Sequence, residues 1–211
     1  MLDIKKAFDR VCRPLVWHKL NKLGIKGKIW RTIKNMFSDI RGKVKVDDTF
    51  SPEFSIKAGV VQGSRLGPTL FSIFINKLIR EVKSAAQGAS FTKGTRVKIL
   101  CFADDIMLIS DDPNDLQKMI DVCHKYACQH FFKFSTKKSK VMIIHHKPKT
   151  HQNLKWHLGR EALDRATTYK YLGVDLCQCV GLGSRALPYK LHHERVISKT
   201  VTRMNMVKHL G

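Results

Sequence analysis

The chain has 211 residues, 43% of them hydrophobic, and its 39 Lys and Arg against 17 Asp and Glu give a formal net charge of +22. This length is enough to bury a sizeable core, and so strong a positive charge favours polyanionic partners, with nucleic acid first and an acidic membrane surface second. Because no apolar run approaches the roughly 18 residues of a membrane span and the N-terminus lacks a secretory pattern, we expect an intracellular protein without a membrane anchor.

Hydrophobic periodicity and turn residues predict strands interleaved with helices. The predicted elements are, in chain order, a strand end and turn at 1–11, helices at 13–24 and 27–37, a hairpin around Asp47–Asp48, a long helix that includes 70–82, strands at 99–103 and 106–110, a helix at 112–131 capped by Asp111 or Asp112, a strand at 137–146, a small closing hairpin built from 154–159 and 168–176, and a final helix at 194–211. This order favours an α+β fold in which helices pack on one face of a mainly antiparallel sheet.

The six cysteines and ten histidines raise the question of a zinc site, since "CHKYACQH" (123–130) and "CQC" (177–179) bring several of them together. Neither stretch has the paired C-x-x-C spacing of a structural zinc site, and the first lies in a helical pattern. Without a secretory signal a disulfide framework is also disfavoured. Buried thiols and surface histidines are the preferred interpretation.

The stretch "CFADDIMLIS" (101–110) places two adjacent carboxylates, Asp104 and Asp105, where two apolar strands meet. Neighbouring negative charges repel each other, and a divalent cation would neutralise them, since Mg²⁺ takes hard oxygen ligands from carboxylates, phosphates and water. A third carboxylate on a neighbouring strand would hold two ions about 3.5–4 Å apart, the spacing used for in-line phosphoryl transfer. Asp3, at the end of an apolar strand, offers that third group. Taken singly, each of these residues would be interpreted as a turn or cap residue in preference to a metal ligand.

Five stretches, in order, resemble the motifs of reverse transcriptases. "LDIKKAFD" (2–9) resembles the first catalytic motif, "GVVQGSRLGPTLFSIFIN" (59–76) the QGS…P…LF motif, and "FADD" (102–105) the [YF]-x-D-D motif. "FSTKKSK" (134–140) and "YKYLGV" (169–174) stand where the lysine and primer-grip motifs would follow. The wording is most similar to the non-LTR, LINE-type retrotransposon branch, with group II intron and bacterial retroelement enzymes as the nearest competitors.

The resemblance implies a polymerase palm over 1–176, without its fingers, and a connector with the start of a thumb-like helix over 177–211. It implies an RNA-directed DNA polymerase that adds dNTPs to the 3′-hydroxyl of a DNA primer on an RNA template, in the nucleus or in a cytoplasmic ribonucleoprotein. The chain starts two residues before Asp3, so we expect a truncated fragment whose first strand is poorly supported. Whether such a fragment acts alone is open.

By the same resemblance, Asp3, Asp104 and Asp105 would surround two Mg²⁺ ions, for which Mn²⁺ could substitute, with the Ile4 carbonyl as an additional ligand. One ion would lower the pKa of the primer hydroxyl, and the other would steady the triphosphate and the leaving pyrophosphate. Lys138 matches the lysine that protonates the departing pyrophosphate, although a lysine run that merely contacts phosphates is an equal alternative.

The resemblance also implies contacts with the incoming nucleotide. Phe8 would press against its sugar and exclude a 2′-hydroxyl, and Gln62, Gly63 and Ser64 would line its site; the alternatives are a core phenylalanine and a loop that caps the long helix. Asp9 is interpreted as a cap on the following helix.

A hairpin at Tyr171, Leu172 and Gly173 would support the primer end, and a plain packed hairpin is the alternative. Two further functions stay in competition with a reverse transcriptase. One is a catalytically silent, basic nucleic-acid-binding remnant of a retrotransposon. The other is an RNA-directed RNA polymerase palm, against which "FADD" and Phe8 both count.

Overall fold

The computed structural model describes residues 1–92, 94–144, 153–178 and 196. They belong to two compact units, one formed by Leu2–Ser135 and the other by Met1 together with the residues from Thr136 onward. The predicted C-terminal helix at 194–211 lies outside the described residues, except for Val196. Within the described part of the chain, every helix is too short or too polar to span a lipid bilayer.

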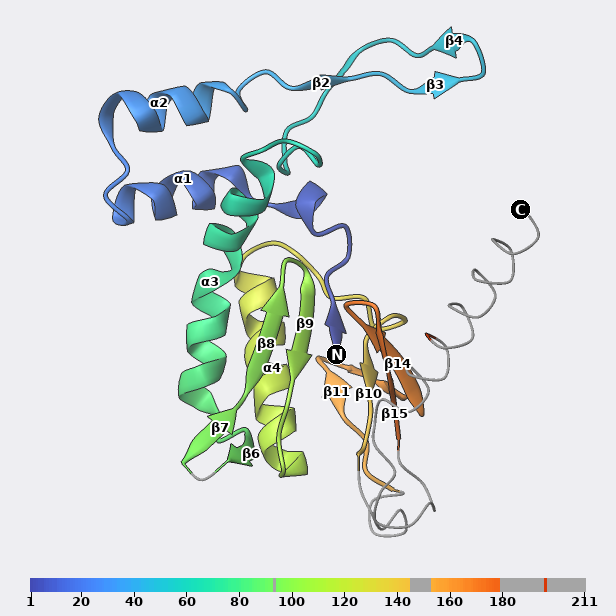
Figure 1. Ribbon diagram of the computed structural model, residues 1–211. Coiled ribbons are helices and arrows are strands. Elements are labelled where there is room, and N and C mark those ends of the chain that lie inside the picture. Colours follow the sequence, from blue (N-terminus) through green and yellow to red (C-terminus); the bar gives the residue numbers. More distant parts are fainter. Residues whose placement is uncertain (93, 145–152, 179–195, 197–211) are drawn as a thin grey trace, which may run out of the picture. The chain divides into compact units, whose positions relative to one another are not determined.

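The larger unit contains the predicted helices. They are α1 (Arg13–Lys22), α2 (Gly27–Asn35), α3 (Gly67–Ala85) and α4 (Pro113–Gln129). Figure 1 shows α1 lying between α2 and the beginning of α3. The N-cap of α4 is Asp112, whose carboxylate accepts hydrogen bonds from two backbone N–H groups of the first turn, as predicted. The predicted cap at Asp9 is wrong, because the N-cap of α1 is Cys12 and no side chain bonds there.

The central sheet of this unit has the order β1-β9-β8 and is antiparallel. Its strands are β1 (Leu2–Asp3), β8 (Ile99–Phe102) and β9 (Asp105–Leu108). Leu2, Ile99, Ile106 and Leu108 are buried, and α3 and α4 contact β8 and β9. Because side chains alternate between the faces of a strand, this face packs on the helices and the other is open. The predicted α+β layer is confirmed (Figure 1).

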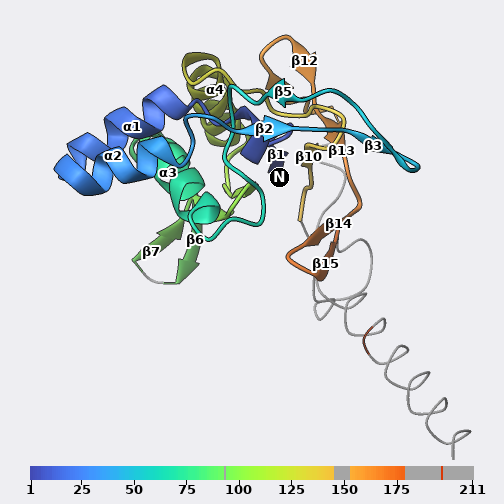
Figure 2. The same ribbon diagram turned by 90° about the horizontal axis from the view of Figure 1, so that it is seen from above.

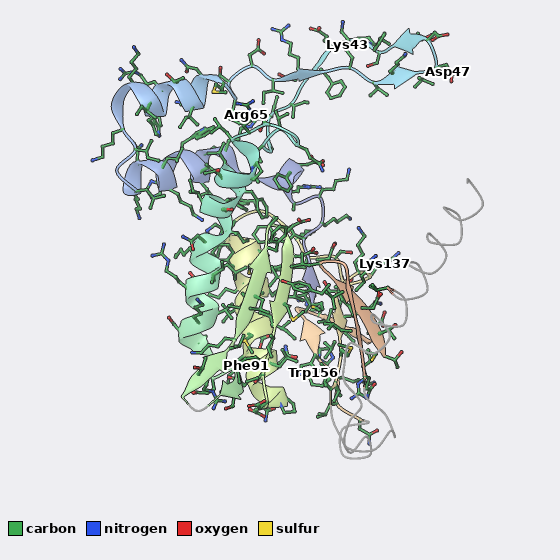
Figure 3. The ribbon with its side chains drawn as sticks, viewed as in Figure 1. Lys43, Asp47, Arg65, Phe91, Lys137 and Trp156 are labelled. Atoms are coloured by element: carbon green, nitrogen blue, oxygen red, sulfur yellow. The ribbon has the colours of Figure 1, made fainter. Side chains whose placement is uncertain are left out.

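A long β-ribbon and a short hairpin complete the larger unit. The ribbon consists of β2 (Arg41–Gly42), β3 (Lys45–Val46), β4 (Thr49–Phe50) and β5 (Phe54–Ser55), and the hairpin consists of β6 (Ala89–Thr92) and β7 (Thr95–Val97). The ribbon turns at Asp47 and Asp48, as predicted, and Figure 3 labels Asp47 at its tip. Asp47 has a φ of +51°, a conformation that Asp adopts more readily than most residues.

The smaller unit is built from short paired strands (Figure 2). Its strands are β10 (Lys140–Val141), β11 (His157–Leu158), β12 (Glu161–Ala162), β13 (Asp164–Arg165), β14 (Thr168–Tyr171) and β15 (Val174–Cys177). The single closing hairpin predicted here is wrong, because β11 pairs with β12 and β14 pairs with β15, so two hairpins form. Gly159 has a φ of +65°, and the chain turns there before it reaches the second hairpin.

Candidate active site

Asp3 and Asp105 are direct cross-strand partners in the β1-β9 pair. Residues directly opposite in an antiparallel pair project from the same face, which here is the face turned away from the helices. The Asp3 carbonyl accepts a hydrogen bond from the Ser135 N–H at 2.8 Å on the other edge of β1. The pair is therefore of the non-hydrogen-bonded kind, in which Cα atoms lie about 4.5 Å apart and side chains approach closely. The sheet thus brings together the two carboxylates that the sequence places in separate motifs.

The connection between β8 and β9 is a two-residue turn formed by Ala103 and Asp104, with Phe102 opposite Asp105. Ala103 has a φ of +52°, the sign required at the first central residue of a type II′ turn and one that glycine usually provides. Partial desolvation in the sheet and, after it, the charge of Asp104 raise the pKa of Asp105 above its ordinary value. The strained backbone conformation is at Ala103, directly before the two carboxylates, and the repulsion is between Asp104 and Asp105.

The strand that carries Asp3 is held on both edges. Beyond its pairing with β9, Ile4 forms a bridge with Phe134, and the Lys5 N–H donates to the Lys133 carbonyl at 2.9 Å. The poor support expected for the first strand is therefore not found. Ile4 itself is buried, whereas Asp3 is half-buried and Asp105 is exposed.

The donor set at this position fits Mg²⁺. Asp3, Asp104 and Asp105 offer carboxylate oxygens, and Mg²⁺ is usually held by one or two carboxylates, with substrate phosphates and water as the remaining ligands. Among the described residues no three His, Cys, Asp or Glu side chains form a ready-made metal cluster.

Phe8 reaches the neighbourhood of the next motif through a sharp turn. The chain bends after Ile4, within the turn predicted for residues 1–11, with a φ of +51° at Lys6. The half-buried ring of Phe8 stacks on Phe71 of α3, with ring centres 5.0 Å apart and an angle of 25° between the planes. The Phe8 carbonyl accepts a hydrogen bond from the Val60 N–H at 2.8 Å. The first motif and the loop that leads to Gln62 are thus joined directly.

Arg13 anchors the loop that leads to Gln62 through hydrogen bonds. Its buried guanidinium donates from Nε to the Gly59 carbonyl at 2.7 Å, from Nη1 to the Phe37 carbonyl at 2.9 Å and from Nη2 to the Ala58 carbonyl at 3.2 Å. Burial lowers its pKa. Arg13 could not be identified from the sequence, because an arginine next to Pro14 at a helix start carries no signal of its distant partners.

Gln62, Gly63 and Ser64 follow as a turn before α3. Gln62 and Gly63 are exposed, and a side chain at Gly63 would meet no atom within 4 Å, although its φ of +88° favours glycine. The Ser64 hydroxyl accepts a hydrogen bond from the Gly67 N–H at 3.0 Å, which satisfies a donor in the first turn of α3. Ser64 therefore has a structural role at the helix start, while Gln62 remains open to a ligand.

The remaining candidates belong to the smaller unit. Lys138 is exposed, whereas Lys140, two residues further along the same motif, donates to Asp164 at 2.6 Å. The β14-β15 hairpin turns at Leu172 and Gly173, whose φ angles of +47° and +86° match a type I′ turn. The hairpin predicted at this position is confirmed, and its contact with a primer stays a prediction.

Comparison with known proteins places these features in one family. The family model described as reverse transcriptase (RNA-dependent DNA polymerase) matches residues 1–176. A Pol polyprotein from the type-1 retrotransposable element R2 of Popillia japonica is 32% identical over 54% of this chain and 19% of its own length. The RNA-directed DNA polymerase from mobile element jockey of Drosophila funebris is 27% identical over 97% of this chain and 22% of its own length. The R2DM polyprotein of Drosophila melanogaster is 26% identical over 82% of this chain and 17% of its own length.

The chain belongs to the reverse transcriptase (RNA-dependent DNA polymerase) family. Its relatives come from non-LTR retrotransposons, which confirms the branch predicted from the motifs. The chain spans about a fifth of the length of these curated relatives.

Proposed function

We propose that this chain is the polymerising core of an RNA-directed DNA polymerase, with the palm over 1–176 and the start of a thumb over 177–211. The observation that carries the proposal is the cross-strand pairing of Asp3 with Asp105 on the open face of the sheet. Like charges placed directly opposite each other destabilise a sheet, so the arrangement favours a role that needs both carboxylates at one point.

The three acids, with the Ile4 carbonyl, would hold two Mg²⁺ ions together with the triphosphate of a dNTP. Bound metal would supply charge neutralisation and an acidified primer hydroxyl. The chain's own part would be positioning: its carboxylates would hold the cations that keep the phosphates in line with the primer end, and such positioning supplies much of the catalysis of phosphoryl transfer.

The other candidates divide the remaining tasks. Phe8, held by Phe71 and by the Val60 N–H, would exclude a ribose 2′-hydroxyl from the nucleotide site. Gln62 would hydrogen-bond the nucleotide or the template, with Gly63 and Ser64 shaping its turn. Lys138 would protonate the leaving pyrophosphate, and the hairpin at Tyr171, Leu172 and Gly173 would support the primer.

Primer extension tests the proposal. The 211-residue chain is incubated with a DNA primer annealed to an RNA template, dNTPs and Mg²⁺ or Mn²⁺, beside an Asp104→Asn variant and an Asp48→Asn control. We expect metal-dependent extension that Asp104→Asn abolishes and Asp48→Asn leaves intact. Extension that survives Asp104→Asn would disprove the role of the acids.

A second function is favoured by the net charge of +22. The chain would then bind nucleic acid through Lys and Arg contacts to phosphates without catalysis, with an affinity that falls steeply as salt rises. The same assay separates the two functions, since the second predicts salt-sensitive binding and no incorporation by the unaltered chain.

A further inference from the structure

A groove of about 840 Å³ lies among α1, α3 and α4, and the central sheet contributes nothing to its lining. On α3 it is lined by Lys77, Arg80 and Ser84, whereas Phe74 and Leu78 of the same helix are buried. The acidic face of the sheet is the one turned away from these helices. The groove is therefore separate from the candidate active site.

The groove is strongly basic. Its lining contains five basic side chains, Lys19, Lys22, Lys77, Arg80 and Lys125, and a single acidic one, Glu81. Glu81 pairs with Lys77 at 3.3 Å. Within the part of the chain that the structure describes, Lys22, Arg80 and Lys125 make no ion pair, and all three are exposed. Several cations from three helices thus face one concave surface with almost no internal counter-charge.

Lys19 illustrates the excess of positive charge in the groove. Its ammonium group is drawn into the wall, where it donates to the Phe74 carbonyl and, at 2.9 Å, to the Tyr126 hydroxyl. Burial and then the charge of Lys77 lower the pKa of Lys19 to about 8; Glu81 opposes this shift, and Arg80 adds a smaller lowering effect. Burying a cation without a paired carboxylate is unfavourable, and an external anion in the groove would relieve it.

We propose that this groove binds the phosphodiester backbone of a nucleic acid, at a second site apart from the acidic face. Lys77 and Arg80 are three residues apart on α3, so their side chains leave the helix about 4.5 Å apart along its axis. Asn76 and Gln129, which also line the groove, provide neutral donors of the kind that contact phosphate and sugar oxygens. A concave surface favours a chain of phosphates over a flat sheet of lipid headgroups.

The test removes three exposed charges from the groove. We compare the unaltered chain with a groove variant, Lys22→Gln/Arg80→Gln/Lys125→Gln, which leaves the structural Lys19 in place.

The control variant is Lys26→Gln/Lys28→Gln/Arg31→Gln. Like the groove variant, it removes two lysines and one arginine from exposed positions, but these lie at α2, outside the groove. Binding to a labelled single-stranded RNA and to a DNA of the same sequence is followed by fluorescence anisotropy over a salt series.

We expect the groove variant to bind about tenfold more weakly than the unaltered chain at moderate salt. The slope of its log affinity against log salt should be shallower by about 2, because each lost phosphate contact removes about 0.7 from this slope for single strands. The control variant should lose no more than about threefold in affinity.

Similar losses for RNA and DNA would assign the contacts to phosphates alone, and a larger loss for RNA would add a contact with the 2′-hydroxyl. Both outcomes support the site. Unchanged binding by the groove variant, or equal loss in both variants, would overturn it. So would displacement of RNA by polyglutamate at equal charge concentration, because the groove would then be a site for acidic peptides.

Circular dichroism checks that both variants fold, and a second measurement on the unaltered chain does not depend on them. RNA should slow acetylation of Lys22 and Lys125 more than that of Lys26 and Lys28, as read by mass spectrometry, and equal protection would contradict the proposal. Asp104→Asn should keep groove binding while it loses primer extension, so failure of this site and failure of the proposed polymerase are told apart.

Discussion

Asp3 and Asp105 face each other across β1 and β9, and this pairing distinguishes one acidic doublet of the chain from two others. Asp47–Asp48 forms the turn of the β-ribbon. Asp111–Asp112 has structural partners, since Asp111 accepts from the Ser90 N–H and Asp112 caps α4. Asp104 lies in the turn between β8 and β9, but within the described residues neither carboxylate of the Asp104–Asp105 doublet accepts a hydrogen bond, and Asp3 stands opposite Asp105. We therefore propose that this doublet serves a ligand.

Replacing Arg13 should loosen the loop that leads to Gln62. Arg13→Met leaves the carbonyls of Phe37, Ala58 and Gly59 without their charged donor, and we expect a loss of about 2–4 kcal/mol in the free energy of unfolding. Urea denaturation measures it. Arg10→Met, at an exposed position nearby, is the control and should change stability by less than about 0.5 kcal/mol. Equal effects of the two substitutions would refute the role of Arg13.

Two glycines of the same loop separate backbone strain from close packing. Gly59 and Gly63 have similar φ angles, +86° and +88°, so alanine at either position costs about 1–2 kcal/mol for the left-handed conformation. At Gly59 a Cβ would also lie 2.8 Å from backbone atoms of Phe8 and Asp9, while at Gly63 it meets nothing within 4 Å. Thermal unfolding should therefore show Gly59→Ala to be less stable than Gly63→Ala by about 1–3 kcal/mol. A loss at Gly63 as large as that at Gly59 is the contrary result.

Asp115 should make stability depend on pH. Burial opposes its ionisation, but hydrogen bonds from the N–H groups of Gln87 and Gly88 and from the Ser110 hydroxyl outweigh burial and lower its pKa. A carboxyl whose pKa is lowered in the folded state stabilises the fold above its unfolded pKa of about 3.9, and this contribution disappears as the pH falls through the folded value.

Asp115→Asn should accordingly lower the unfolding temperature at neutral pH, and the difference from the unaltered chain should shrink in acid. Asp121→Asn, at an exposed position on the same helix, is the matched control, with a small and nearly pH-independent effect. If the unfolding temperatures of both variants change with pH in the same way, the hydrogen bonds to Asp115 do not stabilise its ionised carboxylate.

Local patterns predicted much of this structure. The apolar spacing of α3 and α4, the turn at Asp47–Asp48 and the strands on either side of Asp104 are encoded within short windows of sequence, where periodicity and turn residues decide. The juxtaposition of Asp3 with Asp105 required more, because only the order of family motifs linked two strands so distant in the chain.

What the sequence could not reveal depends on distant contacts. Arg13 is defined by carbonyls from two later segments, and the basic groove arises only when α1, α3 and α4 come together. The closing hairpin was mispredicted because Gly159 and the turn at Leu172 each reverse the chain, and strand patterns of two to four residues do not specify which partner they take.

Binding of a deoxynucleotide in the presence of Mn²⁺ tests the central claim most directly. Calorimetry measures the affinity for dATP of the unaltered chain, of Asp3→Asn, of Asp105→Asn and of the double variant. These four affinities form a double-mutant cycle, and Asp48→Asn serves as the control. If the two carboxylates act on one metal-bound triphosphate, each single variant should lose at least about tenfold in affinity and the double variant little more than either. Losses that simply add, or single variants that bind as the unaltered chain does, would contradict a shared site.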